Sequence, residues 1–226
     1  MAVTATRTVR QVIEDAMGIG GLVDLEEAPT AAEFAKGVRT LDTMLKAWQN
    51  VPYKLWTRTS ISLTLTTAST YTLSPVRPLM IHSARLKRDG QEIMMQPMTR
   101  EEYDLLPNKT SVGQPSQYYY DRQREAATFY VWQQLATANG ETVEITASRE
   151  TEDITAITET VDAPMETIEA INYNLAVRMC HALNTPVPSG IDAYAMRFME
   201  LAEAGDREGS YWFGSHSEGY GYFEAH

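Results

Sequence analysis

The sequence predicts an α+β protein: a four-helix bundle formed by N- and C-terminal helices, an inserted antiparallel β domain and an extended C-terminal arm. Apolar residues recur every three or four positions in residues 1–56 and 150–205, which is helical spacing. They alternate with polar residues in residues 57–149, which is strand spacing. Residues 206–226 have no period and are rich in glycine. These four ranges define three predicted parts of the chain, because the two helical ranges together form one domain.

Two helices are predicted before residue 57. The apolar face of the first is Val9, Val12, Ile13, Ala16 and Met17, and the glycines expected to end it in left-handed conformations are Gly18, Gly20 and Gly21. Thr30 and Glu33 have the spacing of a capping box at the start of the second. The narrow apolar seam of that helix is Phe34, Val38, Leu41, Leu45 and Trp48. Pro52 prevents its continuation.

Six or seven short antiparallel strands are expected over residues 57–149. Ile61, Leu63 and Leu65 alternate with serine and threonine, and the segment of Tyr71 and Leu73 is expected to be their hairpin partner. Asp89-Gly90 predicts a second hairpin with a type I′ turn. Thr99 and Glu102 predict the capping box of a short helix. A small sandwich or barrel fits this pattern.

Helical spacing returns after residue 163. Pro164 precedes a stripe formed by Met165, Ile168, Ile171, Leu175 and Met179. A last helix is marked by Ile191, Tyr194, Ala195, Phe198, Leu201 and Ala202, and Gly205 is expected to end it. We expect these two helices to pack with the first two as a bundle.

Composition excludes several classes of protein. The 226 residues include 19 Lys and Arg against 30 Asp and Glu, a net charge of −11, which argues against free-standing nucleic-acid binding. A single cysteine, Cys180, excludes an internal disulfide framework and fits a reducing compartment. No apolar run approaches the ~18 residues of a membrane span, and the first ten residues lack the apolar stretch of a secretory signal. We therefore expect a soluble acidic protein made in a cytoplasm.

No catalytic, cofactor-binding or metal-binding residue is predicted. Gly18-Ile19-Gly20-Gly21 follows a helix and lacks the third glycine and the lysine of nucleotide loops. The adjacent Cys180 and His181 diverge by ~100° on a helix, which is poor geometry for metal binding. With 30 Asp and Glu in the chain, some pair of carboxylates will lie at the separation that glycoside hydrolysis needs, so such a pair is almost no evidence for a hydrolase. Glu150, Glu152 and Asp153 are interpreted as a solvated loop. Three basic residues beside the Asp-Gly turn could touch phosphate, or could be a charged hairpin edge that blocks aberrant pairing: Arg85, Lys87 and Arg88.

The last sixteen residues hold six of the chain's 21 aromatic side chains. They are Tyr211, Trp212, Phe213, Tyr220, Tyr222 and Phe223. Disordered tails are usually poor in aromatics, whereas aromatics dominate binding hot spots. We interpret this segment as an arm that orders on a partner; packing on its own bundle and disorder are the alternatives.

Five short motifs occur in order along the chain: Met17-Gly18-Ile19, Leu41-x-x-Met44-Leu45-x-x-Trp48, Gly113-Gln114-Pro115, Tyr118-Tyr119-Tyr120-Asp121 and Tyr173-Asn174-Leu175-Ala176. In these motifs the chain resembles the head-to-tail adaptor proteins of short-tailed phages, also called tail accessory or packaged-DNA stabilisation factors. Together the motifs cover roughly residues 8 to 204. One departure is Gln133-Gln134, where the family often has proline.

The resemblance implies a structural virion protein of the neck, synthesised in the bacterial host cytoplasm, with no enzymatic activity, cofactor or membrane. It implies a dodecameric ring that binds below the portal protein, extends the DNA channel, helps to retain the packaged genome and attaches tail nozzle or tail tube proteins. DNA would pass without sequence-specific binding. The six aromatic residues of the arm would then bind the portal.

The acidic C-terminal third fits a DNA channel. Residues 149–226 hold 4 basic and 14 acidic residues, a net charge of −10, and a ring multiplies that charge. Like charges disfavour tight DNA contact within about a Debye length, ~8 Å at physiological ionic strength. Candidate lumen-facing acids are Glu166, Glu169, Glu200 and Glu203. The acidity could equally keep a free monomer soluble.

Two other classes of function are consistent with parts of the sequence. One is a peptidoglycan hydrolase that uses acidic residues, which needs a cleft and a raised pKa on one acid. The other is a carbohydrate-binding module that uses Tyr118–Tyr120 and Trp132 as a stacking platform. In a strand, Tyr118 and Tyr120 share one face while Tyr119 opposes them, so at least one side is expected to pack inward.

Overall fold

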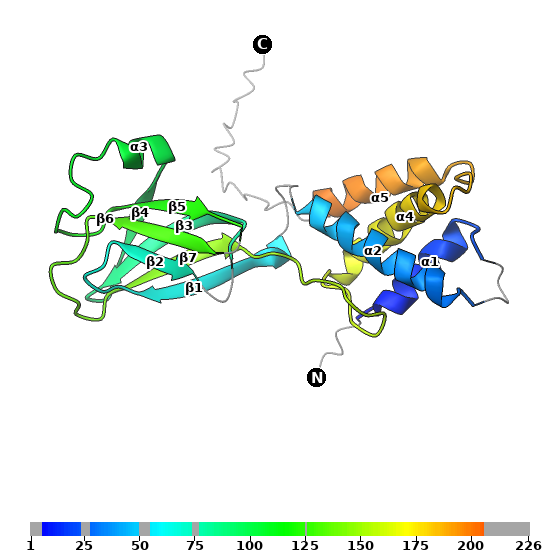
Figure 1. The fold of residues 1–226 in the computed structure, drawn as a ribbon, viewed down its shortest axis with the longest axis horizontal. Coiled ribbons are helices and arrows are strands. Elements are labelled where there is room, and N and C mark those ends of the chain that lie inside the picture. Colours follow the sequence, from blue (N-terminus) through cyan, green and yellow to red (C-terminus); the bar gives the residue numbers. More distant parts are fainter. Residues whose placement is uncertain (1–5, 24–27, 50–54, 74–76, 125, 206–226) are drawn as a thin grey trace, which may run out of the picture.

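Two lobes meet at a narrow waist in the structure of this chain, a computed structural model (Figure 1). It describes residues 6–23, 28–49, 55–73, 77–124 and 126–205. These contain five α-helices and a curled seven-stranded sheet, so the α+β class is confirmed. The strands form one lobe and four of the helices form the other, and each lobe has its own cluster of buried apolar side chains.

Helix α4 (Met165–Ala182) is the centre of the helical lobe. It contacts α1 (Val9–Ile19), α2 (Ala31–Trp48) and α5 (Ile191–Gly205). The hydrophobic core comes from α1, α2, α4 and two side chains of the preceding segment, Ile154 and Val161. Packing of all four helices as a closed bundle stays a prediction.

A capping box sets the start of α2, and a glycine at the end of α1 allows α4 to pack closely. The capping box is confirmed, since Thr30 Oγ1 accepts from Glu33 N (3.3 Å) and Glu33 Oε2 accepts from Thr30 N (2.7 Å). The expectation that Gly18, Gly20 and Gly21 are left-handed and end α1 was wrong, because Gly18 lies inside the helix and only Gly21 among them has a positive φ (61°). Gly20 serves packing instead. A Cβ there would lie 3.1 Å from Cys180 Sγ, so the missing side chain lets α4 approach.

The sheet order is β1-β7-β3-β4-β5-β6-β2. After a 3₁₀ turn, Leu55–Thr57, the bounds are β1 Arg58–Thr64, β2 Thr70–Leu73, β3 Met80–Arg88, β4 Gln91–Met98, β5 Gln117–Arg122, β6 Ala127–Trp132 and β7 Thr142–Ser148. The predicted hairpin between the Ile61 segment and the Tyr71 segment was wrong. β1 pairs along its whole length with β7, and β2 pairs with β6. Alternation of apolar and polar residues predicts a strand, but it does not determine with which other strand that strand pairs.

The Asp89-Gly90 hairpin is confirmed between β3 and β4, with φ of 51° and 76° at the turn, as a type I′ turn requires. The sheet is not wholly antiparallel, because β4 and β5 are parallel and α3 (Arg100–Asp104) lies in the connection between them. A parallel pair needs such a crossover. Sandwich or barrel closure stays a prediction.

The basic residues of β3 do not lie on a sheet edge, which corrects that interpretation. β3 is flanked by β7 and β4. Arg85 and Lys87 form ion pairs with Glu92 at 3.2 and 3.4 Å, across the hairpin. Neighbouring strands therefore supply counter-charges for these two residues. No helix in the described ranges has the length and apolarity that crossing a membrane requires.

Candidate interaction surfaces

An ion pair stabilises the waist, close to the two segments that connect the lobes. Arg149 N donates to Thr57 O (2.9 Å), which joins the segment that enters the β lobe to the one that leaves it. The Arg149 guanidinium donates to both carboxylate oxygens of Asp162, at 2.5 and 2.8 Å. These hydrogen bonds hold the pKa of Asp162 below its ordinary value and raise the pKa of Arg149. The pair therefore connects the two ends of the segment that runs from β7 to the last helices.

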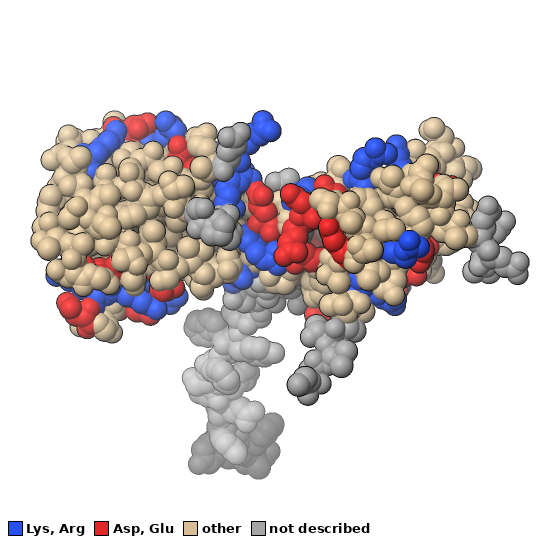
Figure 2. All heavy atoms as spheres, turned by 60° about the horizontal axis from the view of Figure 1, so that its bottom comes forward, with Lys and Arg blue, Asp and Glu red and all other residues tan. Residues whose placement is uncertain are grey.

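A second set of contacts attaches the same segment to α2. Lys46 Nζ donates to Thr151 O (2.7 Å) and pairs with Asp153 (2.5 Å). Asp42 Oδ1 accepts from Ile154 N at 3.2 Å. Figure 2 shows acidic side chains gathered at the waist with basic ones beside them. This acidic cluster is thus partly neutralised, which makes it a poor candidate for a hydrolytic carboxylate pair.

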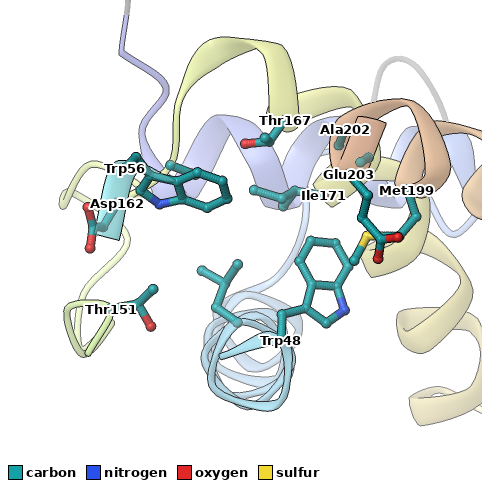
Figure 3. Close-up of a pocket in the computed structure, with 12 residues that line it drawn as sticks. Trp48, Trp56, Thr151, Asp162, Thr167, Ile171, Met199, Ala202 and Glu203 are labelled. Atoms are coloured by element: carbon teal, nitrogen blue, oxygen red, sulfur yellow. The ribbon is translucent and has the colours of Figure 1, made fainter. Parts of the chain in front are cut away.

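A small pocket lies where α2, α4 and α5 reach the waist. Its volume of about 30 Å³ has room for roughly one water molecule. Trp48 from α2 lines one side, with Met199 and Glu203 of α5 next to it (Figure 3). Trp56 and Asp162 lie on the other side. The pocket is too small for a substrate, so we assign it to packing.

Helix α5 presents an apolar stripe that α4 does not cover. Tyr194, Phe198 and Leu201 follow the i, i+4, i+7 spacing of one helix face, yet Tyr194 is 51% and Leu201 57% exposed. Tyr173 of α4 extends the stripe, with ring centroids 5.9 Å from Tyr194 and 4.9 Å from Phe198. The sequence stripe was expected to pack within the bundle, but in α5 its fully buried member is Ala195. Exposed apolar stripes of this kind mark interaction surfaces.

The four candidate lumen acids fall on two sides of α5. Glu166 and Glu169 are exposed and line a groove of about 260 Å³ together with Phe198 and Leu201. Glu203 lies on the other flank, beside Trp48, and Glu200 is exposed. The structure therefore brings Glu166 and Glu169 together beside the apolar stripe.

The six aromatic residues predicted to bind a portal lie outside the described residues. The residues concerned are Tyr211, Trp212, Phe213, Tyr220, Tyr222 and Phe223. Their role stays a prediction.

A tyrosine cluster on the β lobe was not anticipated from the sequence. Tyr103 of α3 stacks on Tyr119 of β5 at 5.3 Å and packs against Tyr130 of β6 at 4.9 Å between ring centroids. Lys109 Nζ lies 5.0 Å from the centre of the Tyr103 ring. The rings attach α3 to the sheet. Strand alternation places Tyr119 and Tyr130 on one face, but nothing local indicates that Tyr103 joins them.

The platform expected for a sugar-binding module has two of its rings turned inward. Tyr118 is buried and stacks on Phe129 at 5.1 Å. Tyr120 Oη donates to Pro78 O, and burial raises the pKa of this phenol to about 12. The expectation that one side of this strand packs inward is confirmed. Trp132 donates its indole N–H to Asn108 O (3.1 Å).

Within the described ranges, no group of three or more His, Cys, Asp or Glu side chains is arranged to hold a metal ion. Cys180 is buried, its thiol donates to Gly20 O (3.6 Å), and burial raises its pKa. A buried, protonated thiol is a packing group and a weak nucleophile.

Comparison with known proteins shows to which protein family the chain belongs. The model of the SU10 adaptor protein family matches residues 6–216, and the chain belongs to this family. No curated protein matches the sequence. Among solved structures, a chain described as the neck of an empty GTA particle computed with C6 symmetry is 15% identical and has a TM-score of 0.30. The match covers 87% of this chain and 92% of that one, and at this TM-score it has no bearing on function.

Proposed function

We propose that this chain is a head-to-tail adaptor of a phage with a short tail, and that it functions as a ring in the virion neck. The supporting observation is the family match, which extends over residues 6–216 and thus includes both lobes. In this proposal the ring binds below the portal protein, continues its DNA channel, helps to retain the packaged genome and receives tail nozzle or tail tube proteins. The ring is dodecameric, as the resemblance implies.

Its organisation follows the two hydrophobic clusters. Residues 1–56 and 150–205 form the helical domain, residues 57–149 the inserted β domain, and residues 206–226 the arm. The separate buried clusters of the two lobes support this division. The ion pair of Arg149 with Asp162 joins the end of the β domain to the helical domain, which suits a protein that must hold its two lobes in a fixed relation within an assembly.

The acidic flank of α5 is proposed to face the channel. Glu200 and Glu203 lie on the side of α5 that does not contain the apolar stripe, and Glu200 is exposed. Repeated around a ring, these carboxylates would repel the DNA phosphates within ~8 Å. DNA would then slide through without being gripped.

Mixing the purified chain with its portal protein and imaging the product by electron microscopy tests the proposal. We expect portal rings capped by a second ring. Absence of any association, at protein concentrations where both partners are folded, would refute the adaptor function. Release of soluble fragments from peptidoglycan by the same preparation would favour the hydrolase instead.

A further inference from the structure

A groove between α1 and α2 lies on the opposite side of the helical lobe from α5. It is lined by Arg10 of α1, by Phe34, Val38 and Arg39 of α2, and by Ile157, and its volume is about 630 Å³. In Figure 1 α5 lies along the upper side of this lobe, whereas α1 and the segment before α4 lie along the lower side. Ala35 also lines this groove, which we call the α1–α2 groove.

The α1–α2 groove has an apolar floor and a basic rim. Phe34 and Val38 are buried or half-buried on the floor, while Arg10 and Arg39 are exposed. The Arg10 guanidinium lies 4.8 Å from the centre of the Phe34 ring, and its Nη1 is 3.4 Å from Glu14. The groove therefore offers apolar contact area and cationic donors at its margins.

The uncovered surface of α4 and α5 has the opposite character. We call it the α5 ridge and define it by Tyr173, Tyr194, Phe198, Leu201, Glu166 and Glu169. Its centre is the aromatic and aliphatic stripe, and its margin holds two exposed carboxylates. An apolar centre with a charged rim is the usual anatomy of a protein interface.

We propose that the α5 ridge of one copy binds the α1–α2 groove of the next copy. This inference rests on the proposed ring and identifies the surfaces that build it. Both surfaces belong to the same chain and are complementary in polarity and charge, so a second copy satisfies both at once. Glu166 and Glu169 would face Arg10 and Arg39, and opposite potentials at a rim favour correct encounter and register.

The placement of the two surfaces gives the assembly its geometry. A contact between two different patches is heterologous, and it repeats from copy to copy until the rotation closes a ring. Each copy would contact one neighbour through its α5 ridge and the other neighbour through its α1–α2 groove. The flank of α5 with Glu200 is not part of the contact and stays free for the channel.

A charge exchange in full-length protein tests the contact. The assay supplies variants in trans to phage that lack the gene and measures the amount of this chain in purified particles. Glu166→Arg with Glu169→Arg should lower incorporation about tenfold or more, and Arg10→Glu with Arg39→Glu should do the same, because like charges then meet. Combining all four changes restores the opposite charges and should recover incorporation. Thermal unfolding of each purified variant shows whether it is folded.

Reversal of two carboxylates outside both surfaces is the matched control. Glu101→Arg with Glu152→Arg changes the same number of charges at exposed positions and should leave incorporation unchanged. If wild-type protein is incorporated but the fourfold variant is not rescued, the proposed contact is wrong while the adaptor function stands. If wild-type protein is absent from particles, the adaptor function itself fails.

Disulfide cross-linking gives a second measurement that does not depend on charge. Ala35 is exposed in the lining of the groove, so Ala35→Cys with Leu201→Cys should give a ladder of covalent multimers in oxidised particles. Ala35→Cys with Met196→Cys is the control, because Met196 is 69% exposed but lies about 140° around α5 from Leu201, away from the apolar stripe. Disulfides need Cα atoms within about 7 Å. Equal ladders from both pairs, or none from the first pair in particles that contain the protein, would overturn the proposal.

Discussion

Individual contacts at the waist and between helices set the stability of the helical lobe. Asp162 accepts two hydrogen bonds from Arg149, and its side chain is only 18% exposed. Gly37 faces Ile13 of α1, and a Cβ at this position would lie 2.8 Å from Ile13 Cγ2. Neither role could be assigned from local sequence, because both partners lie at a distance along the chain.

We expect Asp162→Asn to lower the free energy of unfolding by about 2 kcal/mol at neutral pH, since it removes charge from a partly buried, bidentate pair. The folded pKa of Asp162 is lowered, so its contribution is complete above the unfolded pKa and is lost as pH falls through the folded pKa. Urea unfolding from neutral to acidic pH measures this difference. It should shrink towards acid pH. Asp153→Asn is the control: Asp153 is 78% exposed, and its change should cost at most about 0.5 kcal/mol.

Gly37→Ala should destabilise the protein by about 1–3 kcal/mol, because the added methyl group overpacks the contact between α1 and α2. Gly18→Ala is the matched comparison in α1. A Cβ there meets nothing within 4 Å, so alanine should stabilise the protein by up to about 1 kcal/mol through helix propensity. Differential scanning calorimetry measures both effects. Similar changes for the two variants would contradict the assignment of Gly37 to close packing.

At the scale of elements, what the sequence predicts depends on whether the cause is local. The capping boxes at Thr30 and Thr99 and the Asp89-Gly90 turn are confirmed, because each involves residues within four positions. Strand partners are decided between distant segments, so the pairing of β1 with β7 and the parallel pair of β4 and β5 were missed. The stripe on α5 was found, but spacing alone could not tell that α4 leaves part of it exposed.

The start of α2 provides a test at this scale. Thr30→Ala should cost about 1 kcal/mol of stability, because the N–H of Glu33 loses its acceptor at the helix terminus. Thr30→Ser keeps the hydroxyl and should recover most of that loss. Chemical denaturation of the two variants and the wild type decides between them. An equal loss for serine and alanine would show that the threonine methyl, and not the cap, is responsible.

For the whole molecule, the distribution of charge is the property that relates structure to the proposed function. The acids of the waist are partly paired, whereas Glu200 is exposed on α5. The candidate lumen acids could be named from the sequence, but their division between two flanks of α5 required the structure. Family membership gives the class of protein, and a channel lined by some of these acids is part of the proposed function.

Reversal of the proposed channel charge, by Glu200→Lys with Glu203→Lys, should slow genome ejection because the lysines attract DNA phosphates. Ejection rates from purified particles, measured with a DNA-binding dye, give the result, and the slowing should weaken as salt is raised. Ejection at the wild-type rate at all salt concentrations would contradict a lumen position for these acids.

Removal of residues 209–226 should abolish binding to the portal while the described lobes stay folded. Co-sedimentation with portal rings measures binding, and circular dichroism measures folding. A variant with the six aromatic residues changed to serine provides the matched control for length. Unchanged binding by both variants would refute the docking role of the arm.

The central claim is that this chain joins head and tail as a structural part of the virion. The most direct measurement is the DNA content and tail occupancy of particles made without this gene product. We predict heads that have lost their packaged chromosome and have no tails, with both defects repaired when the protein is supplied in trans. Particles that keep their DNA and carry tails normally would contradict the account.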